Sequence, residues 1–426
     1  MELIILLAGF FALLLLGMPV AFALGLSSLA TLLYLDIPMV VAFQRMAAGI
    51  DIFALMAIPL FIYAGELMNQ SGIALRLVTL AESIIGRLKG GLGHVNILSC
   101  MLFGAVSGSA VASVSAMGSS LMPIMRDKGY DEDFVVNVTA TASTTGLLIP
   151  PSHNMIIYAI AASGGVSIIS LFLAGLVPGL LLGLALMVVT YFVAGARGYP
   201  QGTFPGWRAL GLAFAAALPG LVSTAIILLG IVSGAFTATE SSAIAVVYTV
   251  LVAVLVYRSL DWAGFVIATT TAVRTTAIVM FIVAMASAFG WLMAVAEVPL
   301  RLSELLLSVS ESPLVLLLLI NLMLLVLGTF MDMAPLIVIT TPIFLPIITK
   351  LGMDPVQFGV LLILNLGVGL VTPPVGSVLF VGCAVGEIPI ERCLRSIWPF
   401  YLAMLLILAL VTVFPAISLT LPQLIQ

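Results

Sequence analysis

The sequence predicts an all-α polytopic membrane protein. Of its 426 residues, 63% are hydrophobic and 8% are charged, and the mean hydropathy is +1.33. A soluble protein of this length carries about a quarter charged residues. Glycine and proline also interrupt the apolar runs at matching places in the two halves of the chain. This pattern predicts an inverted repeat with two re-entrant hairpins and two broken helices.

Composition excludes several classes of protein. The formal net charge of −4 leaves no basic face for nucleic acid. Cys100, Cys383 and Cys393 are an odd number in apolar surroundings, which is typical of small core residues and not of a disulfide framework. The two histidines, His94 and His153, have no metal-site spacing. We therefore expect no enzymatic activity and no organic cofactor.

The first half divides into segments by the requirement for about 20 apolar residues per span. We predict a span over 3–34 kinked near Gly17-Met18-Pro19, a span over 50–69, an interfacial helix over 72–89, a hairpin over 92–126, a broken span over 133–163 and a long span over 167–195. Residues 72–89 are amphipathic and charged, which favours the membrane surface. The apolar run at 3–34 lacks a preceding basic region, so it is predicted to be a first membrane helix and not a cleaved signal. It could also form two short crossings.

The second half follows the same order. We predict spans over 210–232 and 236–257, a segment over 264–296 that is interfacial before it crosses, a second hairpin over 312–349, a second broken span over 357–386 and a last span over 397–420. The second hairpin would turn near the sequence GTFMDMAP.

The basic residues test this layout. If residues 70–91 are cytoplasmic, ten basic residues lie inside and three lie outside, and Arg274 falls in or near a span. The inside set is Arg76, Arg87, Lys89, Arg126, Lys128, Arg197, Arg208, Arg258, Arg392 and Arg395, and the outside set is Arg45, Arg301 and Lys350. This excess agrees with the positive-inside rule. It places the N-terminus in the cytoplasm and the C-terminus in the periplasm.

The two halves match at a nearly constant shift. Leu67-Met68 and Leu75-Arg76-Leu77 match Leu292-Met293 and Leu300-Arg301-Leu302 at a shift of 225, Gly104 matches Gly328 at 224, and Pro123, Gly129, Asp131, Gly146 and Pro150-Pro151 match Pro346, Gly352, Asp354, Gly369 and Pro373-Pro374 at 223. The first hairpin enters from the cytoplasm and the second from the periplasm, so the repeat is inverted. Inverted broken helices that meet at mid-membrane are typical of secondary transporters.

The first hairpin tip is a candidate sodium site. Serine hydroxyls and backbone carbonyls freed from a helix are hard oxygen ligands suited to Na⁺, and we expect no other metal. The predicted ligands are Ser107, Gly108, Ser109, Gly146 and Ile149. At Gly146 we expect both a permissive backbone conformation and a close approach of the hairpin. A small-residue cluster can also serve only for close helix packing.

The second hairpin tip is the symmetric candidate. Its predicted ligands are Gly328, Thr329, Asp332, Gly369 and Thr372. Asp332 is the only acidic residue between Pro313 and Thr349. An intramembrane carboxylate is costly and marks a functional candidate. A hydrogen-bonded structural carboxylate at the tip explains Asp332 equally well.

The residues after the proline pairs are candidate substrate ligands. Pro150, Pro151, Pro373 and Pro374 break the two helices, and the half-helices that follow begin near Ser152, Asn154, Gly376 and Ser377. Free N–H groups and the helix dipole favour a carboxylate at such ends. Ser152 could equally be a plain N-cap.

Four further polar residues have weaker signals. Proton relay by His153 is not favoured, and Glu66 lies within or beside a span. Glu240 follows two threonines like a capped helix start, which indicates a structural role. Arg274 could contact substrate, but snorkelling to the interface is the preferred interpretation.

Several longer motifs add to this pattern, and they cover nearly the whole chain. They are FIYAGELMNQSG, FGAVSGSAVASVSAMGS, LMPIMRDKGYDEDF, GLLIPPSHNMIIYA, GAFTATESSAIA, LGMDPVQFGVLLILNLGVGLVTPPVGSVLF and WPFYLAMLLILALVTVFP. With them the chain resembles the large membrane subunit of a tripartite ATP-independent periplasmic (TRAP) transporter. One departure is Ala238, where the family commonly has proline, and it bears on local helix-start geometry.

The resemblance implies an ion-transporter-type fold and an elevator mechanism in the bacterial inner membrane. Residues 1–91 and 196–311 would form the scaffold with its interfacial arms, and residues 92–195 and 312–426 the transport domain. Uptake would use a Na⁺ gradient and carry an organic acid such as a C4-dicarboxylate, sialic acid or another sugar or keto acid. A separate small four-helix membrane subunit, a periplasmic substrate-binding protein and membrane lipid would be the partners.

Three other functions compete with this one. A stand-alone Na⁺/dicarboxylate carrier or ion antiporter of related architecture would need no binding protein. A membrane enzyme is disfavoured because no set of Ser, His and Asp is placed for catalysis. A channel needs no inverted pair that closes around an occluded site.

Overall fold

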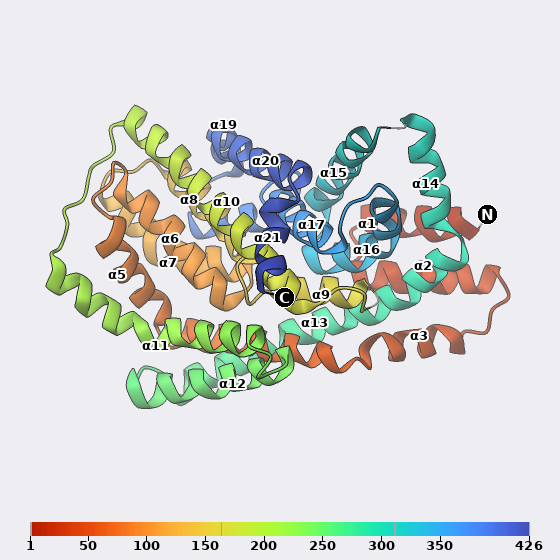
Figure 1. The fold of residues 1–426 in the computed structure, drawn as a ribbon, viewed down its shortest axis with the longest axis horizontal. Helices are drawn as coiled ribbons and strands as arrows, with labels where there is room; N and C mark the ends of the chain where they lie inside the picture. The colour runs from red at the N-terminus through yellow and green to blue at the C-terminus, as the bar shows by residue number, and fades with distance from the viewer. Residues whose placement is uncertain (1, 163, 311, 426) are drawn as a thin grey trace.

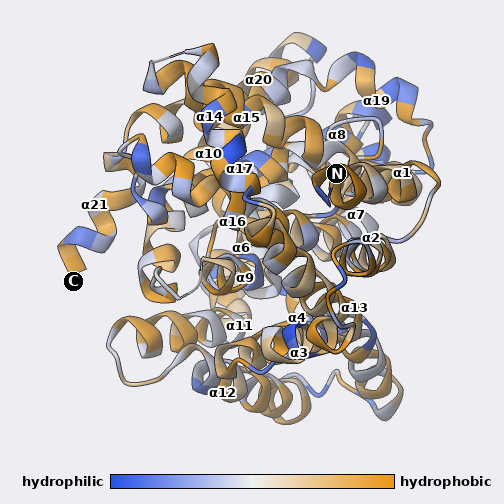
Figure 2. Ribbon diagram, turned by 90° about the vertical axis from the view of Figure 1, so that its right-hand side faces the viewer, coloured by the Kyte–Doolittle hydropathy of each residue, from blue (hydrophilic) through white to orange (hydrophobic). Residues whose placement is uncertain are grey.

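The computed structural model describes residues 2–162, 164–310 and 312–425. Helices joined by turns and loops form this part of the chain. The only β pairing within it is an isolated bridge between Lys89 and Gln201. Figure 1 shows helices of very different length, with α9 and α17 near the centre. Hydrophobic residues run along nearly every helix, and hydrophilic residues gather mainly at helix ends and loops (Figure 2). This distribution suits a protein whose outer surface faces lipid.

Six helices in the described part are long and apolar enough to cross a membrane. They are α10 (Ile168–Arg197), α11 (Trp207–Val232), α12 with its continuation (Ala238–Val256), α13 (Trp262–Val295), α15 (Pro313–Phe330) and α16 (Met333–Lys350). Two bent pairs raise the total to eight if each pair is one span. The predicted all-α polytopic architecture is confirmed.

The N-terminal region corrects one prediction. Residues 3–34 do not form a single kinked span. η1 (Ile4–Ala8) and α1 (Gly9–Leu15) run one way, and α2 (Val20–Tyr34) runs back beside them, so that Gly9 lies against Ser27. Gly17 has a φ of +82° and Pro19 cannot donate a backbone hydrogen bond, so the chain reverses there.

The next segment contains a helix that the sequence analysis missed. α3 (Val40–Ile50) precedes η2 (Phe53–Met56) and α4 (Ala57–Gln70), and the pair is bent by 63°. The matching part of the second half is the unbroken α13. Two shorter helices follow α4 and α13, namely α5 (Ile73–Ile85) and α14 (Val298–Val309). α5 is the predicted interfacial helix, and α14 was not predicted.

Both predicted hairpins and both broken helices are present. The first hairpin is α6 (Gly91–Ser107) and α7 (Ala110–Asp127), followed by α8 (Glu132–Ser143), the turn η3 (Thr144–Leu147) and α9 (His153–Ala161). The second hairpin is α15 and α16, followed by α17 (Pro355–Gly369) and α18 (Ser377–Val385). Both proline pairs contain a cis peptide bond.

The last predicted span is also divided. α19 (Ile390–Ser396) leads into α20 (Trp398–Val413) at a bend of 62°, and α21 (Ala416–Ile425) follows after a break at Phe414 and Pro415. Proline removes a backbone donor and so ends α20 where a single span over 397–420 was predicted.

The helix boundaries confirm the internal repeat. Adding 223 to the first and last residue numbers of α7 (110–127) gives those of α16 (333–350). A shift of 225 carries the start of α5 onto the start of α14, and the residues before these starts, Gly72 and Glu297, both have a left-handed backbone, with φ of 69° and 55°. A left-handed conformation at a non-glycine residue is uncommon, so its recurrence at this position supports a true repeat.

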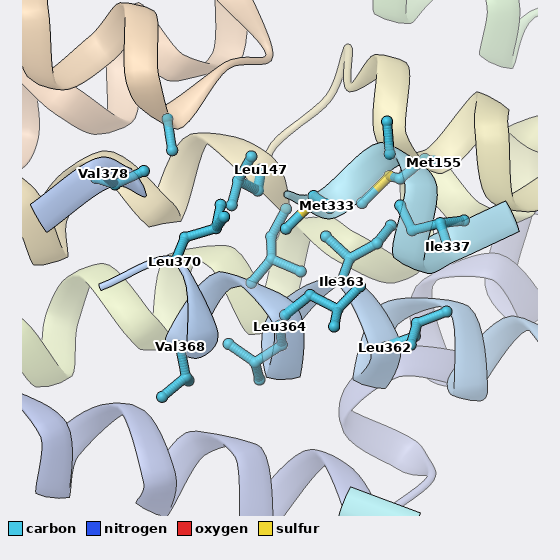
Figure 3. Close-up of a cluster of buried hydrophobic side chains, with 14 of the residues drawn as sticks. Leu147, Met155, Met333, Ile337, Leu362, Ile363, Leu364, Val368, Leu370 and Val378 are labelled. Atoms are coloured by element: carbon cyan, nitrogen blue, oxygen red, sulfur yellow. The ribbon is translucent and has the colours of Figure 1, made fainter. Parts of the chain in front are cut away.

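The two halves share one core. Leu147 from the first broken segment and Leu370 from the second point into an apolar cluster with Met333 (Figure 3). Polar groups also join the halves, because Tyr158 donates to the carbonyl of Pro355 at 2.6 Å. Residues 92–195 and 312–420 therefore interlock across the repeat.

Each hairpin meets its broken helix at a pair of glycines. A Cβ added at Gly146 would lie 2.4 Å from the Cα of Gly104, and one at Gly369 would lie 2.7 Å from the Cα of Gly328. Gly146 does not have a left-handed backbone, so it is needed for space and not for an unusual φ. A permissive backbone and a close approach were both predicted at Gly146, and only the close approach is borne out.

We predict that Gly146→Ala lowers the thermal unfolding temperature of the purified protein, because the new methyl group would overlap the backbone of Gly104. Gly195→Ala is the matched control, since Gly195 lies within α10 and a Cβ there meets nothing within 4 Å. That change should be neutral or slightly stabilising. Equal unfolding temperatures for the wild type and Gly146→Ala would contradict the packing described.

Candidate functional site

A cavity of about 440 Å³ lies where the hairpin tips face α4 and α13. One wall is α4 and α13, which contribute Gly65, Glu66, Asn69, Thr271 and Thr275, among others. The opposite wall is the first hairpin tip, the start of α9 and the start of α16. A cavity of this size is in the range of small-molecule sites.

Three helix N-termini converge on this cavity. The lining includes Ala110–Ala112 at the start of α7, His153 and Asn154 at the start of α9, and Met333 and Ala334 at the start of α16. Free N–H groups and the positive end of the dipole lie at each start. No lysine or arginine is among the described lining residues. The donors that can attract an anion here are therefore the backbone N–H groups of the helix starts and the uncharged polar side chains of the lining.

Two of these helices are capped by equivalent residues. The Ser109 hydroxyl accepts from the Ala112 amide at 3.2 Å, and the Asp332 carboxylate accepts from the Met333 amide at 2.9 Å. Ser109 and Asp332 match at the repeat shift of 223. The two hairpins therefore differ at one position by a carboxyl group, and both capping residues line the cavity.

The first predicted sodium site is partly assembled. Gly108, with a φ of +61°, turns the chain at the hairpin tip, and a Cβ there would lie 3.0 Å from the Pro151 carbonyl oxygen. Ser107 and Ser109 line the cavity, Gly146 lies against Gly104, and Ile149 is buried against Gly179. The tip and the broken segment are thus brought together, whereas Ile149 packs toward α10.

Hydrogen bonds hold the second predicted sodium site together. The Thr329 carbonyl accepts from the amides of Val375 and Gly376 at 3.1 and 3.3 Å. The hydroxyls of Thr329 and Thr372 donate to carbonyls of their own helices at 2.8 and 2.7 Å, which leaves their oxygen lone pairs available. Gly328 and Gly369 are in backbone contact. Asp332 extends from this tip into the cavity.

The predicted substrate residues separate into two groups. Asn154 lines the cavity, and Ser152 is fully buried behind it with an unpartnered hydroxyl. Gly376 and Ser377 begin α18 and do not line the cavity. His153, which was given little weight, does line it.

One whole wall of the cavity was not predicted from the sequence. Glu66 and Asn69 are three residues apart on α4, and Thr271 and Thr275 are four apart on α13, so each pair occupies one helix face. Polar residues at helical spacing in an apolar helix were the available signal. No hydrogen bond or ion pair of the Glu66 side chain occurs within the described residues.

The other two weak candidates lie outside the cavity. Glu240 completes a capping box with Thr237, in which its carboxylate accepts from the Thr237 amide at 2.8 Å. This confirms the structural interpretation. Arg274 is exposed on α13 and does not line the cavity.

Two relatives match nearly the whole chain. An uncharacterized protein, YgiK, of Salmonella typhimurium is 45% identical over 425 residues, with 99% of this chain and 97% of the relative covered. The sialic acid TRAP transporter large permease protein SiaM of Vibrio cholerae is 41% identical over 417 residues, with 98% and 97% covered. The fold is similar to that of the Alcanivorax borkumensis YdaH transporter, with a TM-score of 0.63 at 14% identity and 88% of each chain covered.

The model of one protein family matches residues 7–417, which include both hairpins, both broken helices and the cavity walls. That family is described as the DctM component of the tripartite ATP-independent periplasmic transporter. The chain belongs to this family, the large permease proteins of TRAP transporters.

Proposed function

We propose that the chain is the large permease subunit of a Na⁺-coupled, binding-protein-dependent transporter that imports an organic acid by an elevator mechanism. The observation that carries the proposal is the convergence of α7, α9 and α16 on one cavity whose described lining has no lysine or arginine. Three helix N-termini can hold a carboxylate in place of arginine or lysine. Transporters built from broken helices bind anionic groups of their substrates in this way.

The substrate class rests on the cavity and on the family. Sialic acid, named for the Vibrio cholerae relative, is a carboxylic acid with many hydroxyl groups. The polar side chains of Asn69, Thr271, Thr275 and Asn154 suit such groups. A C4-dicarboxylate or another sugar or keto acid would use the same helix ends.

Sodium would bind at the two hairpin tips. At the second tip the hydroxyl oxygens of Thr329 and Thr372 and the carboxylate of Asp332 are hard ligands. The Thr329 carbonyl already accepts two N–H groups, so its hydroxyl is the better candidate. At the first tip Ser107 and Ser109 supply hydroxyls and no charge. The two sites would therefore differ in affinity.

An elevator needs a moving body that slides past a scaffold. Leaving Glu2 and Ser170 aside, no side-chain hydrogen bond or ion pair within the described residues joins 2–69 and 210–296 to 92–195 and 312–420. Polar links run inside each group instead, such as Asn137 to the carbonyl of Cys393 at 2.9 Å. A contact of this kind lets one group slide without breaking hydrogen bonds. The cavity lies at the end of α4 and the start of α13, which we predict to be cytoplasmic, so this is an inward-facing state.

The family supports the remaining partners. A tripartite system requires a small membrane subunit and a periplasmic binding protein beside this chain. We propose that both are separate proteins and that the complex resides in the bacterial inner membrane.

We predict that proteoliposomes containing this chain, its small subunit and its binding protein accumulate a labelled organic acid only under an inward Na⁺ gradient. Sialic acid and succinate are the first substrates to test. Replacement of external Na⁺ by K⁺ should abolish uptake. Equal uptake without the binding protein would favour a stand-alone carrier, and uptake without Na⁺ would remove the proposed coupling.

Asp332→Asn should raise the Na⁺ concentration for half-maximal uptake by roughly ten- to a hundredfold, because a charged ligand contributes about 1.5–3 kcal/mol. Ser109→Gly, at the equivalent cap, should raise it only about two- to fivefold, because it removes a neutral hydroxyl and retains most of the capping. Lowering the pH should weaken Na⁺ activation in the wild type more than in Asp332→Asn. Superimposable Na⁺ curves for the wild type and Asp332→Asn would exclude Asp332 from the ion site.

A further inference from the structure

A second cavity, of about 330 Å³, lies on the opposite part of the same interface. One wall is formed by α3, η2 and α13, and the other by α9 and α16. Its scaffold residues include Gly49, Ser287, Gly290 and Ala294. α3 precedes α4 and the Gly290 end of α13 follows the Thr271 end, so this cavity lies toward the predicted periplasmic side.

The repeat relates this cavity to the first cavity, at the hairpin tips. We call the first one the substrate cavity, because we propose that substrate binds there. At the shift of 225, Ile62, Gly65 and Asn69 of the substrate cavity become Ser287, Gly290 and Ala294, which line the second one. At the shift of 223, Ser115 becomes Val338, which also lines it. In an inverted repeat, exchange of the two local conformations produces the opposite-facing state. The second cavity thus corresponds to the substrate cavity of the outward-facing state.

The equivalent glycines Gly65 and Gly290 differ in what packs against them. A Cβ at Gly65 would lie 3.0 Å from the Cα of Ser107, so the first hairpin tip is seated against α4. A Cβ at Gly290 meets nothing within 4 Å. The second hairpin therefore has an open place on α13 that it does not occupy here.

The residues that follow these glycines differ in chemical type, one being acidic and the other aromatic. Glu66 follows Gly65 and lines the substrate cavity. Trp291 follows Gly290, which lines the second cavity, and is not itself one of the lining residues. The guanidinium of Arg45 lies 5.0 Å from the centre of the Trp291 ring. Arg45 precedes Gly49 by one turn of α3, so it occupies the same helix face. It is exposed, and no ion pair involves it within the described residues.

We propose that Arg45, held against Trp291, receives the carboxylate of the substrate in the outward-facing cavity. The proposal rests on the function proposed above. Stacking on an indole face orients a guanidinium and leaves its edge N–H groups free for a bidentate contact with a carboxylate. The acidic residue nearest to Arg45 in the sequence, Asp51, follows the end of α3. On the inner side the equivalent scaffold position is Glu66, and no lysine or arginine is among the described lining residues there.

The test uses the complete complex in proteoliposomes under an inward Na⁺ gradient. The probe is sialic acid or succinate, whichever the wild-type complex accumulates, and the loaded binding protein is supplied in excess. Arg45→Gln should lower the maximal uptake rate roughly tenfold, as for loss of a charged hydrogen bond, and Arg45→Lys should restore part of it. Lys350→Gln is the control, since it removes another basic residue predicted to be periplasmic and should have no effect. The Na⁺ concentration for half-maximal uptake should stay unchanged in all three variants.

Two results would overturn the proposal. A wild-type uptake rate for Arg45→Gln would show that the residue does not contact substrate. Recovery of the wild-type rate at a higher concentration of binding protein would show that Arg45 docks that protein and not the carboxylate. Failure of the wild-type complex to accumulate either acid would instead count against the proposed function.

Discussion

The fold depends on the need to satisfy interrupted backbone inside a membrane. Pro150-Pro151 and Pro373-Pro374 break two helices, and lipid offers no hydrogen bonds to the groups that are released. Each break is covered by a hairpin, and the cover is close because Gly104 and Gly328 permit backbone to lie on backbone. The same geometry turns the starts of α7, α9 and α16 toward one cavity.

A second consequence is the division of polar contacts. Hydrogen bonds such as that from Tyr158 to Pro355 join the two hairpin-containing halves to each other. Others, such as that between Tyr63 and Thr269 at 2.9 Å, join α4 to α13 in the proposed scaffold. Between the two groups the contacts are apolar or glycine-mediated, as at Gly65 and Ser107. Such an interface resists separation but not sliding.

The sequence predicted the hairpins, the broken helices and the repeat, because glycine and proline act locally and leave a visible pattern. It did not predict the turn within 3–34 or the separate α3, because these depend on how short apolar helices pack. The cavity wall of Glu66, Asn69, Thr271 and Thr275 was missed since it forms only when α4 and α13 lie side by side. Ser377 was expected in the substrate site, but it begins α18 and does not line the cavity.

The central claim is that the hairpin domain moves past the scaffold. A Cβ built on Gly65 lies 3.5 Å from the Cβ of Ser107, which a disulfide can bridge. The most direct measurement is uptake by the Gly65→Cys, Ser107→Cys double variant before oxidation, after oxidation and after reduction. The three native cysteines are buried, which limits background reaction, and Ser107→Cys alone is the control. The account predicts that oxidation arrests uptake and reduction restores it, whereas undiminished uptake by fully cross-linked protein would contradict it.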